Sequence, residues 1–160
     1  MNTPFAWFAS IIFTFGYFSN NSIGYLSPSN DEFPKGIKVI EVGCGKGDFL
    51  ELLNSEDYFN TYGYDAAYDG NNPKIYKRYL HHEDKIKADL VVLRHVLEHI
   101  PQPHAFLRLL YKIFGETKIY IEVPDFDWIK KNQAFFDVTY EHVNYFRLSD
   151  LKNMFSALIL

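Results

Sequence analysis

The stretch IKVIEVGCGKGDFLELL, residues 37–53, decides the fold. Its first six residues are a short run rich in β-branched side chains, which is typical of a buried parallel strand. Glu41, Gly43, Gly45 and Gly47 then form the pattern E-x-G-x-G-x-G, and the apolar spacing predicts a helix that opens around residues 46–48. Glycines at such a turn let the backbone approach a ligand without a Cβ in the way, and the helix offers its N-terminal N–H groups. We therefore predict a strand–loop–helix unit that binds a ligand.

Further strands follow this unit, separated by stretches that we interpret as helical. They are TYGYD (61–65), KIYKRYL (74–80), ADLVVL (88–93) and TKIYIEV (117–123). PHAFLRLLYKIF, residues 103–114, predicts an amphipathic helix closed by Gly115. Strands connected in this way need crossovers, so we predict a doubly wound, mostly parallel α/β sheet with helices on both faces. Such sheets bind ligands at the carboxyl ends of their strands.

The composition excludes several classes of protein. At 160 residues the chain fits one domain, and with 48% hydrophobic residues, 15 Phe and 12 Tyr it is typical of a globular protein with an aromatic interior. The net charge of -4 and the scattered Lys and Arg residues offer no basic surface, so we predict no nucleic-acid partner. Cys44 is the only cysteine, which excludes an internal disulfide and fits a reducing cytoplasm.

The N-terminal residues need a separate interpretation. FAWFASIIFTFGYF, residues 5–18, is apolar but shorter than the ~18–20 residues that a membrane span needs, and no Lys or Arg precedes it to form a signal peptide. We predict no transmembrane span and interpret residues 4–18 as an aromatic helix packed on the domain, with contact to a membrane surface or a partner as the alternative. Residues 1–35 are then an N-terminal helix and loop, and residues 36–160 the ligand-binding domain.

Residues at the predicted strand ends indicate what the sheet binds. The dinucleotide fingerprint G-x-G-x-x-G requires a third glycine at position 48, where this chain has Asp48. Asp65 ends the second strand, where its two carboxylate oxygens can accept both hydroxyls of an adenosine ribose. HHEDK, residues 81–85, is either an adenine contact or a solvated polar loop.

Two histidines follow the fourth strand. His95 and His99 are four residues apart and would share one helix face, which is a spacing that can bind a metal. Glu98 would point elsewhere on that helix, and no third ligand of similar spacing is nearby. We therefore predict no metal site.

Residues 37 to about 151 resemble one family, the class I S-adenosylmethionine-dependent methyltransferases, and within it bacterial sugar methyltransferases. The segments IKVIEVGCGKGDFLELL, YGYD, DLVVLRHVLEHI, IYIEVPDFD and YEHVNYFRLSDLKNMF occur in the order and spacing of deoxysugar C-methyltransferases and related enzymes of surface-polysaccharide clusters. The resemblance implies S-adenosyl-L-methionine as the cofactor, with the glycine loop facing its methionine part. The cofactor contacts that it implies are Glu41, Gly43, Cys44, Gly45, Gly47, Asp65, Arg94 and His95.

The resemblance also implies a catalytic cleft. In the C-methylating group it is formed by a Tyr-x-Glu-His-x-x-x-Phe-Ser signature after the fifth strand and by a histidine after the fourth. Glu141, His142 and His99 match these positions, whereas Thr139 takes the place of the tyrosine and Tyr140 stands one residue further on. Methyl transfer requires the removal of one proton, so His142 and His99 are the predicted bases, with Glu141 orienting an imidazole or a substrate hydroxyl. A half-buried structural histidine is the alternative for His142.

The chain departs from that group in two further ways. The C-methylating enzymes carry a cysteine-bound zinc domain, and they continue past the helix that LKNMFSALIL, residues 151–160, begins. We therefore expect the sheet to lack the last two strands of the methyltransferase fold, and a homo-oligomer to cover the open edge.

The predicted function is that of a cytoplasmic S-adenosylmethionine-dependent methyltransferase acting on a sugar, nucleotide-linked or in a glycan, in surface-polysaccharide biosynthesis. The absence of the tyrosine and of the zinc domain favours O-methylation over C-methylation. One alternative is a cofactor-binding but catalytically weak truncated paralogue or partner subunit. Another is a nicotinamide-dependent oxidoreductase, which Asp48 disfavours.

Overall fold

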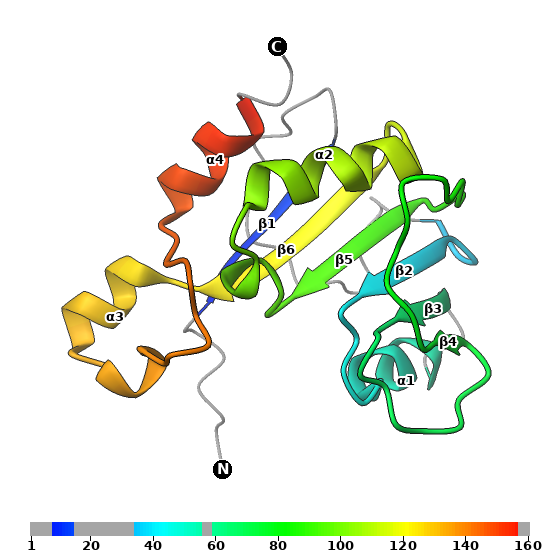
Figure 1. Cartoon of the computed structure of the whole chain (residues 1–160), viewed down its shortest axis with the longest axis horizontal. Coiled ribbons are helices and arrows are strands. Elements are labelled where there is room, and N and C mark those ends of the chain that lie inside the picture. The colour runs from blue at the N-terminus through cyan, green and yellow to red at the C-terminus, as the bar shows by residue number, and fades with distance from the viewer. Residues whose placement is uncertain (1–7, 15–33, 56–58, 157–160) are drawn as a thin grey trace.

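The fold is built on a six-stranded sheet with the strand order β1-β6-β5-β2-β3-β4 (Figure 1). The computed structural model describes residues 8–14, 34–55 and 59–156. The strands are β1 (Phe8–Thr14), β2 (Lys38–Val42), β3 (Asn60–Tyr64), β4 (Ile75–Tyr76), β5 (Leu90–Arg94) and β6 (Lys118–Pro124). The α-helices are α1 (Asp48–Ser55), α2 (Pro103–Phe114), α3 (Phe126–Asn132) and α4 (Leu148–Ser156), and two short 3-10 helices are η1 (Leu97–His99) and η2 (Phe135–Asp137).

The five strands from β2 to β6 are parallel, as predicted. The chain runs from β2 outward through β3 to β4, and then returns to place β5 and β6 on the other side of β2. The strand order therefore reverses between β2 and β5, which is where doubly wound sheets bind their ligands. This arrangement confirms the predicted Rossmann-like α/β fold.

Helices cover both faces of the parallel strands. On one face, alternate strand residues such as Ile40, Leu93 and Ile121 pack against Leu107 of α2 and Leu151 of α4. On the other face, the intervening strand residues pack against Leu53 of α1; they are Val39, Leu90, Val92 and Tyr120. Because both faces are buried, the strands are continuously apolar, which is why β2 and β5 could be recognised in the sequence.

The connections between the middle strands differ from the prediction. We predicted a strand over residues 74–80, but β4 contains only Ile75 and Tyr76. The described connections on either side of β4 contain no helix. The sequence DAAYDGNNP that precedes β4 is rich in turn-forming residues, and after it the chain turns at once, with Arg78 N–H donating to the Tyr76 carbonyl at 2.8 Å. Residues 77–80 therefore form a loop at the carboxyl end of the sheet.

The predicted N-terminal helix is wrong over its described part. Residues 8–14 form β1, which pairs antiparallel with β6 in a register that runs from Phe8 opposite Pro124 to Thr14 opposite Lys118. The segment FASIIFT is rich in aromatic and β-branched residues, which favour a strand when an open sheet edge is available. The rest of the predicted helix, residues 4–7 and 15–18, lies outside the described residues. The edge of β6 that we expected to be open is thus covered by the same chain, and no second copy is needed there.

The described C-terminal part returns to the carboxyl end of the sheet. Beyond β6 the chain forms α3 and η2, and Phe126 N–H then donates to the Phe146 carbonyl at 2.9 Å, which holds residue 146 beside the end of β6. The segment 139–145 is thereby brought next to η1, which follows β5. Among the described helices, none has the length and apolar character required to cross a membrane.

Candidate functional site

The glycine loop after β2 has the backbone geometry that its sequence predicts. Gly43, Gly45 and Gly47 all have positive φ, at 74°, 54° and 87°. A Cβ on Gly43 would lie 2.5 Å from Cγ2 of Val96, and one on Gly47 would lie 2.4 Å from Cδ1 of Ile75. Gly43 therefore needs to be glycine for two reasons, its conformation and its contact with the segment after β5.

Asp65 is held beside this loop at the carboxyl end of β3. Its Oδ2 accepts a hydrogen bond from Gly45 N–H at 2.8 Å, and its Oδ1 accepts one from Ala67 N–H at 2.8 Å. These two bonds fix the orientation of the carboxylate. Each oxygen keeps a further lone pair, so the group can still accept hydrogen bonds from a ligand.

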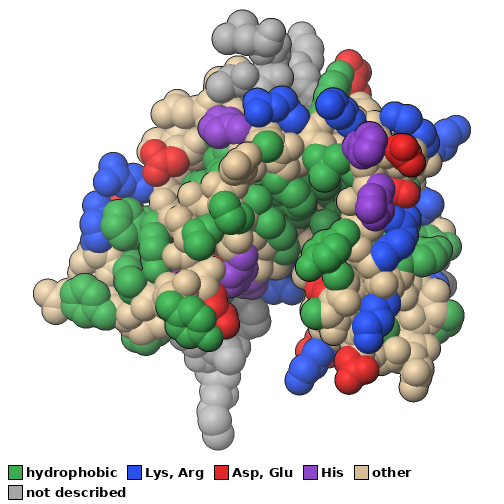
Figure 2. Space-filling model, viewed as in Figure 1, with side chains coloured by type: hydrophobic (Ala, Val, Ile, Leu, Met, Phe, Trp, Pro, Cys, Tyr) green, Lys and Arg blue, Asp and Glu red, His purple; other side chains and the backbone are tan. Residues whose placement is uncertain are grey.

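A pocket of about 440 Å³ opens next to Gly43 and Asp65. Hydrophobic side chains gather around the hollow below α2 (Figure 2). A pocket of this size and apolar character is typical of small-molecule and cofactor sites. Its lining residues are Val42, Gly43, Tyr64, Asp65, Ala66, Ala67, Arg78, Tyr79, Leu80, Val96, Ile100, Phe106 and Leu109.

Several of these lining residues were missed at the sequence level. Arg78, Tyr79 and Leu80 fell inside the strand predicted over 74–80, and they line the pocket because β4 ends at Tyr76. Phe106 and Leu109 belong to α2, which was predicted as an amphipathic helix without a role in the site. The loop 81–85, the alternative adenine contact, is not among the lining residues. Its Asp84 instead pairs with Arg78 at 2.8 Å.

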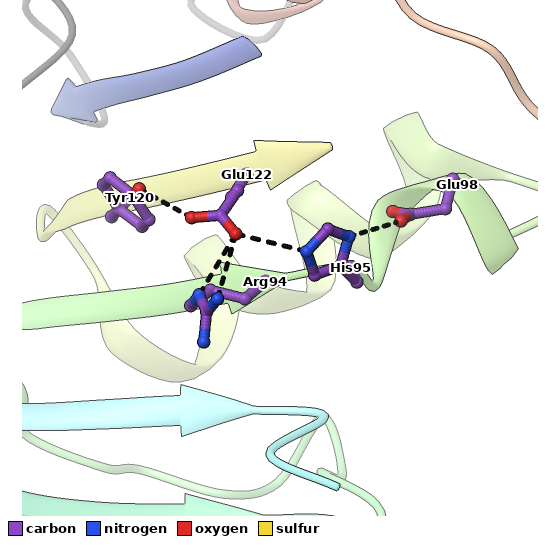
Figure 3. Close-up of polar contacts among 5 residues, drawn as sticks. All are labelled: Arg94, His95, Glu98, Tyr120 and Glu122. Atoms are coloured by element: carbon purple, nitrogen blue, oxygen red, sulfur yellow. Dashed lines mark hydrogen bonds and ion pairs between the residues drawn. The ribbon is translucent and has the colours of Figure 1, made fainter. Parts of the chain in front are cut away.

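A network of charges centred on the buried Glu122 lies near the carboxyl ends of β5 and β6 (Figure 3). Glu122 Oε1 accepts a hydrogen bond from Arg94 at 3.0 Å and lies 3.2 Å from His95 Nε2, while its Oε2 accepts one from the Tyr120 hydroxyl at 2.9 Å. Burial opposes ionisation of Glu122, but hydrogen bonds from His95 and Arg94 outweigh it and lower its pKa to about 2. The carboxylates of Glu122 and Glu98 raise the pKa of His95 to about 9.

Arg94 and His95, two predicted cofactor contacts, are thus members of this network. His95 adopts a positive φ of 53°, which is uncommon for a residue with a side chain, and its imidazole lies between the carboxylates of Glu98 and Glu122. The sequence analysis did not single out Glu122. A glutamate within the apolar strand KIYIEVP was the signal that could have identified it.

Glu41 and Cys44, two further predicted cofactor contacts, are both buried. Burial raises the pKa of Glu41 to about 8, and its Oε2 has no hydrogen-bond partner among the described residues. Cys44 packs with Leu50, Tyr68 and Ile75, and burial raises the pKa of its thiol to about 12. The Cys44 side chain therefore belongs to the core, and only its backbone belongs to the glycine loop.

Two of the four predicted catalytic residues come together. The rings of His99 and His142 lie 4.9 Å apart between centroids in an edge-to-face arrangement. His99 Nδ1 lies 2.9 Å from the Glu141 carbonyl oxygen, so Glu141 orients an imidazole through its backbone. The Glu141 side chain is exposed, and that of Tyr140 is 93% exposed. The structure therefore does not bring Tyr140 to the two histidines.

The position of Glu98 corrects the predicted helix after β5. His95 does not share a helix face with His99, because only residues 97–99 are helical and they form a 3-10 turn. Glu98 is almost completely buried, and its Oε1 lies 3.3 Å from His95 Nδ1. A donor atom of Glu98 also lies within 4.8 Å of donor atoms of His99 and His142. Contrary to the prediction, Glu98 is turned toward the histidines.

Comparison with known proteins gives a family match over most of the chain. A family model described as a methyltransferase domain matches residues 21–158. No curated protein matches the chain. Among solved structures, a SAM-dependent methyltransferase from Archaeoglobus fulgidus is similar with a TM-score of 0.57 and 24% identity, over 77% of this chain and 60% of that one.

A second solved structure has a similar fold at lower identity. The plantazolicin methyltransferase BpumL in complex with SAH has a TM-score of 0.58 and 16% identity, over 74% of this chain and 53% of that one. At these identities the two structures show likeness of fold alone. The chain spans less than two thirds of the length of either.

Proposed function

This chain belongs to the family of class I S-adenosylmethionine-dependent methyltransferase domains, and on that premise we propose that it binds S-adenosylmethionine and methylates a sugar. When bound, the cofactor supplies an electrophilic methyl group on a sulfonium. The chain's own residues have to hold the donor, orient the acceptor and remove one proton. The observation that carries the proposal is the position of Asp65, fixed between the glycine loop and a nucleoside-sized apolar pocket.

The residues at the donor end fit the cofactor. The pocket beside Val96 and Phe106 offers an apolar surface for an adenine ring, and the Asp65 carboxylate retains lone pairs for two ribose hydroxyls. Space is open at the Cβ position of Gly45, where backbone can contact a ligand closely. The buried Glu41 oxygen without a partner would accept a hydrogen bond from the ammonium of the methionine part.

The network that contains Arg94 and His95 stabilises the part of the site that would bind the methyl donor. Arg94 lies over the ring of Phe49 in α1 at 4.2 Å and is bonded to Glu122 of β6. Arg94, at the end of β5, therefore contacts both α1 and β6 beside the point where the strand order reverses. These contacts hold the glycine loop and the segment after β5 in position relative to each other. We propose that Arg94 and His95 act on the cofactor through this positioning.

At the acceptor end, we propose His99 and His142 as the residues that hold and deprotonate a sugar hydroxyl. The carbonyl of Glu141 can only accept a hydrogen bond, so Nδ1 of His99 carries the proton and Nε2 is left with a lone pair for a substrate proton. The matches at Glu141, His142 and His99 to the sugar methyltransferase signature support a sugar acceptor, and Thr139 in place of the tyrosine favours an oxygen acceptor.

A catalytically weak, cofactor-binding protein is the second candidate. The exposure of the Tyr140 and Glu141 side chains favours it, because only two of the four predicted catalytic side chains meet. This candidate shares the donor end of the site with the first and differs from it only in turnover.

The donor end is tested by calorimetric titration of the chain with S-adenosylmethionine and with NAD. We expect binding of S-adenosylmethionine alone, weakened at least about tenfold in Asp65→Asn, because the loss of charge-assisted hydrogen bonds is worth ~1.5–3 kcal/mol. The exposed Asp69→Asn is the matched control and should bind as the wild type does. Binding of NAD in preference to S-adenosylmethionine would refute the proposal.

The acceptor end is tested by methyl transfer to a panel of nucleotide sugars. We expect transfer by the wild type and by the exposed control His104→Ala, and a loss of about 100-fold or more in His142→Ala, the usual size of a general-base contribution. Full activity of His142→Ala would remove this residue from the mechanism. Cofactor binding without transfer to any sugar would favour the second candidate.

A further inference from the structure

Glu98, His99 and His142 bring three potential metal ligands to one point of the fold. One donor atom from each side chain lies within 4.8 Å of the donor atoms of the other two. In a tetrahedral site with bonds of ~2.0–2.2 Å, ligand atoms lie roughly 3.3–3.6 Å apart. Shifts of about 1 Å, within the range of small side-chain rotations, would bring the three atoms to that spacing.

The tautomer of His99 leaves one ring nitrogen available as a ligand. Its Nδ1 donates to the Glu141 carbonyl at 2.9 Å, which leaves the lone pair on Nε2. Histidines that bind metals usually donate their other ring N–H to a backbone carbonyl or a carboxylate in this manner, because the bond fixes both the tautomer and the ring orientation.

Buried polar atoms without hydrogen-bond partners point to a ligand at this place. The Glu98 side chain is 2% exposed, and neither of its oxygens has a hydrogen-bond partner among the described residues. His142 Nδ1 is likewise buried and has no such partner. Leaving such groups unsatisfied destabilises a fold, most of all where the group is charged. A cation bound by one Glu98 oxygen and by His142 Nδ1 would satisfy two of these atoms.

His95 contacts the Glu98 carboxylate and holds it in position. His95 Nδ1 lies 3.3 Å from Glu98 Oε1, at ion-pair distance but not in hydrogen-bond alignment (Figure 3). This contact uses one oxygen and leaves Oε2 for a ligand. Metal-binding carboxylates commonly have such a supporting partner.

The two segments that carry the three residues are joined by backbone hydrogen bonds. The Glu98 carbonyl accepts from Val143 N–H at 2.9 Å and from Asn144 N–H at 3.1 Å. The Asn144 side chain donates to the Ile100 carbonyl at 2.7 Å. The segment after β5 and the segment before α4 therefore form one preorganised unit, as a metal site requires.

From these contacts we propose that Glu98, His99 and His142 form a binding site for one divalent transition-metal ion of the Zn²⁺ type. Two imidazoles and one carboxylate are the ligand set of open catalytic zinc sites and of other first-row metal sites. Mg²⁺ and Ca²⁺ prefer sites made wholly of oxygen ligands, so they are not expected to bind here. Three protein ligands leave at least one position for a substrate oxygen or water.

The metal site is inferred from contacts that do not depend on the proposed function. Its role in catalysis rests on the proposed function and adds a way of binding the acceptor. His99 and His142 lie at the proposed acceptor end, so a bound cation would hold the acceptor hydroxyl as a further ligand. An imidazole nitrogen that binds a cation cannot also serve as a base. In the metal-bound state the cation would lower the pKa of the coordinated hydroxyl, and the proton released by it would pass to water.

The test is calorimetric titration of the untagged full chain with ZnCl₂ and, separately, with MgCl₂. The exposed pair His81 and His82 is replaced by alanine in every protein, which removes an adventitious site from the surface. We expect one Zn²⁺ per chain and no Mg²⁺. Binding should weaken at least tenfold in His142→Ala, His99→Ala and Glu98→Gln, and remain unchanged in the exposed control His104→Ala.

Two further measurements keep the outcome interpretable. Circular dichroism establishes that each variant is folded, and His99, which is exposed, is the ligand whose replacement is least able to perturb the core. The visible spectrum of the Co²⁺-loaded chain should show intense bands of a four- or five-coordinate ion that are lost in His99→Ala. Equal Zn²⁺ affinity in all folded variants, or no binding to the starting protein, would overturn the inference.

A parallel titration with S-adenosylmethionine separates the two proposals. Binding of S-adenosylmethionine without binding of Zn²⁺ refutes the metal site and leaves the proposed function standing. Binding of Zn²⁺ that depends on the three ligands, without binding of S-adenosylmethionine, supports the metal site and refutes the proposed function.

Discussion

Glu122 connects more functional groups than any other acid described above. Arg94, His95 and Tyr120 all contact its two oxygens, and it lies at the carboxyl end of β6 beside the switch in strand order. A buried carboxylate surrounded by donors stabilises the fold only while it is ionised, because its partners are arranged for a charge.

The pKa of Glu122 determines when that stabilisation is available. Its pKa is lowered from 4.5 to about 2, so its contribution is fully present above pH 4.5 and is lost as the pH falls from 4.5 toward 2. We expect Glu122→Gln to lower the free energy of unfolding at pH 7 by about 3 kcal/mol, because the pKa is lowered by about 2.5 (4.5 minus 2) and each pKa unit corresponds to ~1.36 kcal/mol. Urea unfolding at pH 7 and at pH 3 measures this, and the difference from the wild type should shrink at the lower pH.

Glu116→Gln is the matched control for this prediction, since Glu116 is exposed. It should unfold as the wild type does at both pH values. A Glu122→Gln variant as stable as the wild type at pH 7 would mean that the network contributes no net stability.

The limits of sequence-based prediction are clear at the scale of residues. Glycines 43, 45 and 47 and Asp65 were identified because their spacing follows from a strand end, which is a local pattern. Glu98 was predicted to point away from the histidines and Glu122 was missed, because what distinguishes both residues is burial against partners elsewhere in the fold. Cys44 was assigned to the ligand loop, but its side chain packs in the core, since the sequence does not reveal which side of a loop a residue takes.

Among the elements, β1 is the one whose structure differs most from its prediction. Helix α2 was predicted over exactly its observed residues, because its apolar spacing and the following Gly115 are both local signals. Strand β1 is stabilised by pairing with β6, far along the chain, so its own sequence does not determine its structure. Strand β4 is short for a local reason, because turn-forming residues precede it and the chain turns again between Tyr76 and Arg78.

Proline substitution tests whether residues 8–14 form the strand β1 or the helix that the sequence predicted. In an edge strand only alternate N–H groups donate to the neighbouring strand, so Ile11→Pro and Ile12→Pro should differ sharply. We expect one to destabilise the fold by ~3 kcal/mol or more and the other by much less. Thermal unfolding of both variants measures the difference. A helix would be broken at either position, so equal large losses would contradict the strand.

At the scale of the whole molecule, the buried Glu41 and Glu122 change the pH dependence of stability in opposite directions. Burial raises the pKa of Glu41 to about 8, so between pH 4.5 and 8 the folded state holds a proton that the unfolded state releases. Stability therefore falls across this range as the pH rises, with a slope of up to ~1.4 kcal/mol per pH unit. Glu122 lowers stability only below pH 4.5. Together they place the maximum stability of the chain on the acidic side of neutrality.

A pH series of thermal unfolding tests this expectation. The wild type should be most stable near pH 5 and should lose stability steadily toward pH 8. Glu41→Gln keeps the shape of the side chain without the titration, so it should flatten the decline between about pH 5 and 6.5 and be more stable than the wild type at pH 8. Above pH 6.5 a shallower decline should remain, because the raised pKa of His95 makes its contribution fall there too. An unchanged slope in Glu41→Gln would show that Glu41 does not control the decline.

The pairing of β1 with β6 also has a consequence for the order of events during synthesis. Thr14 pairs with Lys118, 104 positions later in the chain (118 minus 14), so β1 leaves the ribosome long before its partner exists. At about 5–20 residues per second this delay amounts to roughly 5–20 seconds. During that interval an aromatic, β-prone segment has no strand to pair with. An unpaired β-prone segment is a site at which separate chains can pair, and this site is closed once β6 is made and pairs with β1.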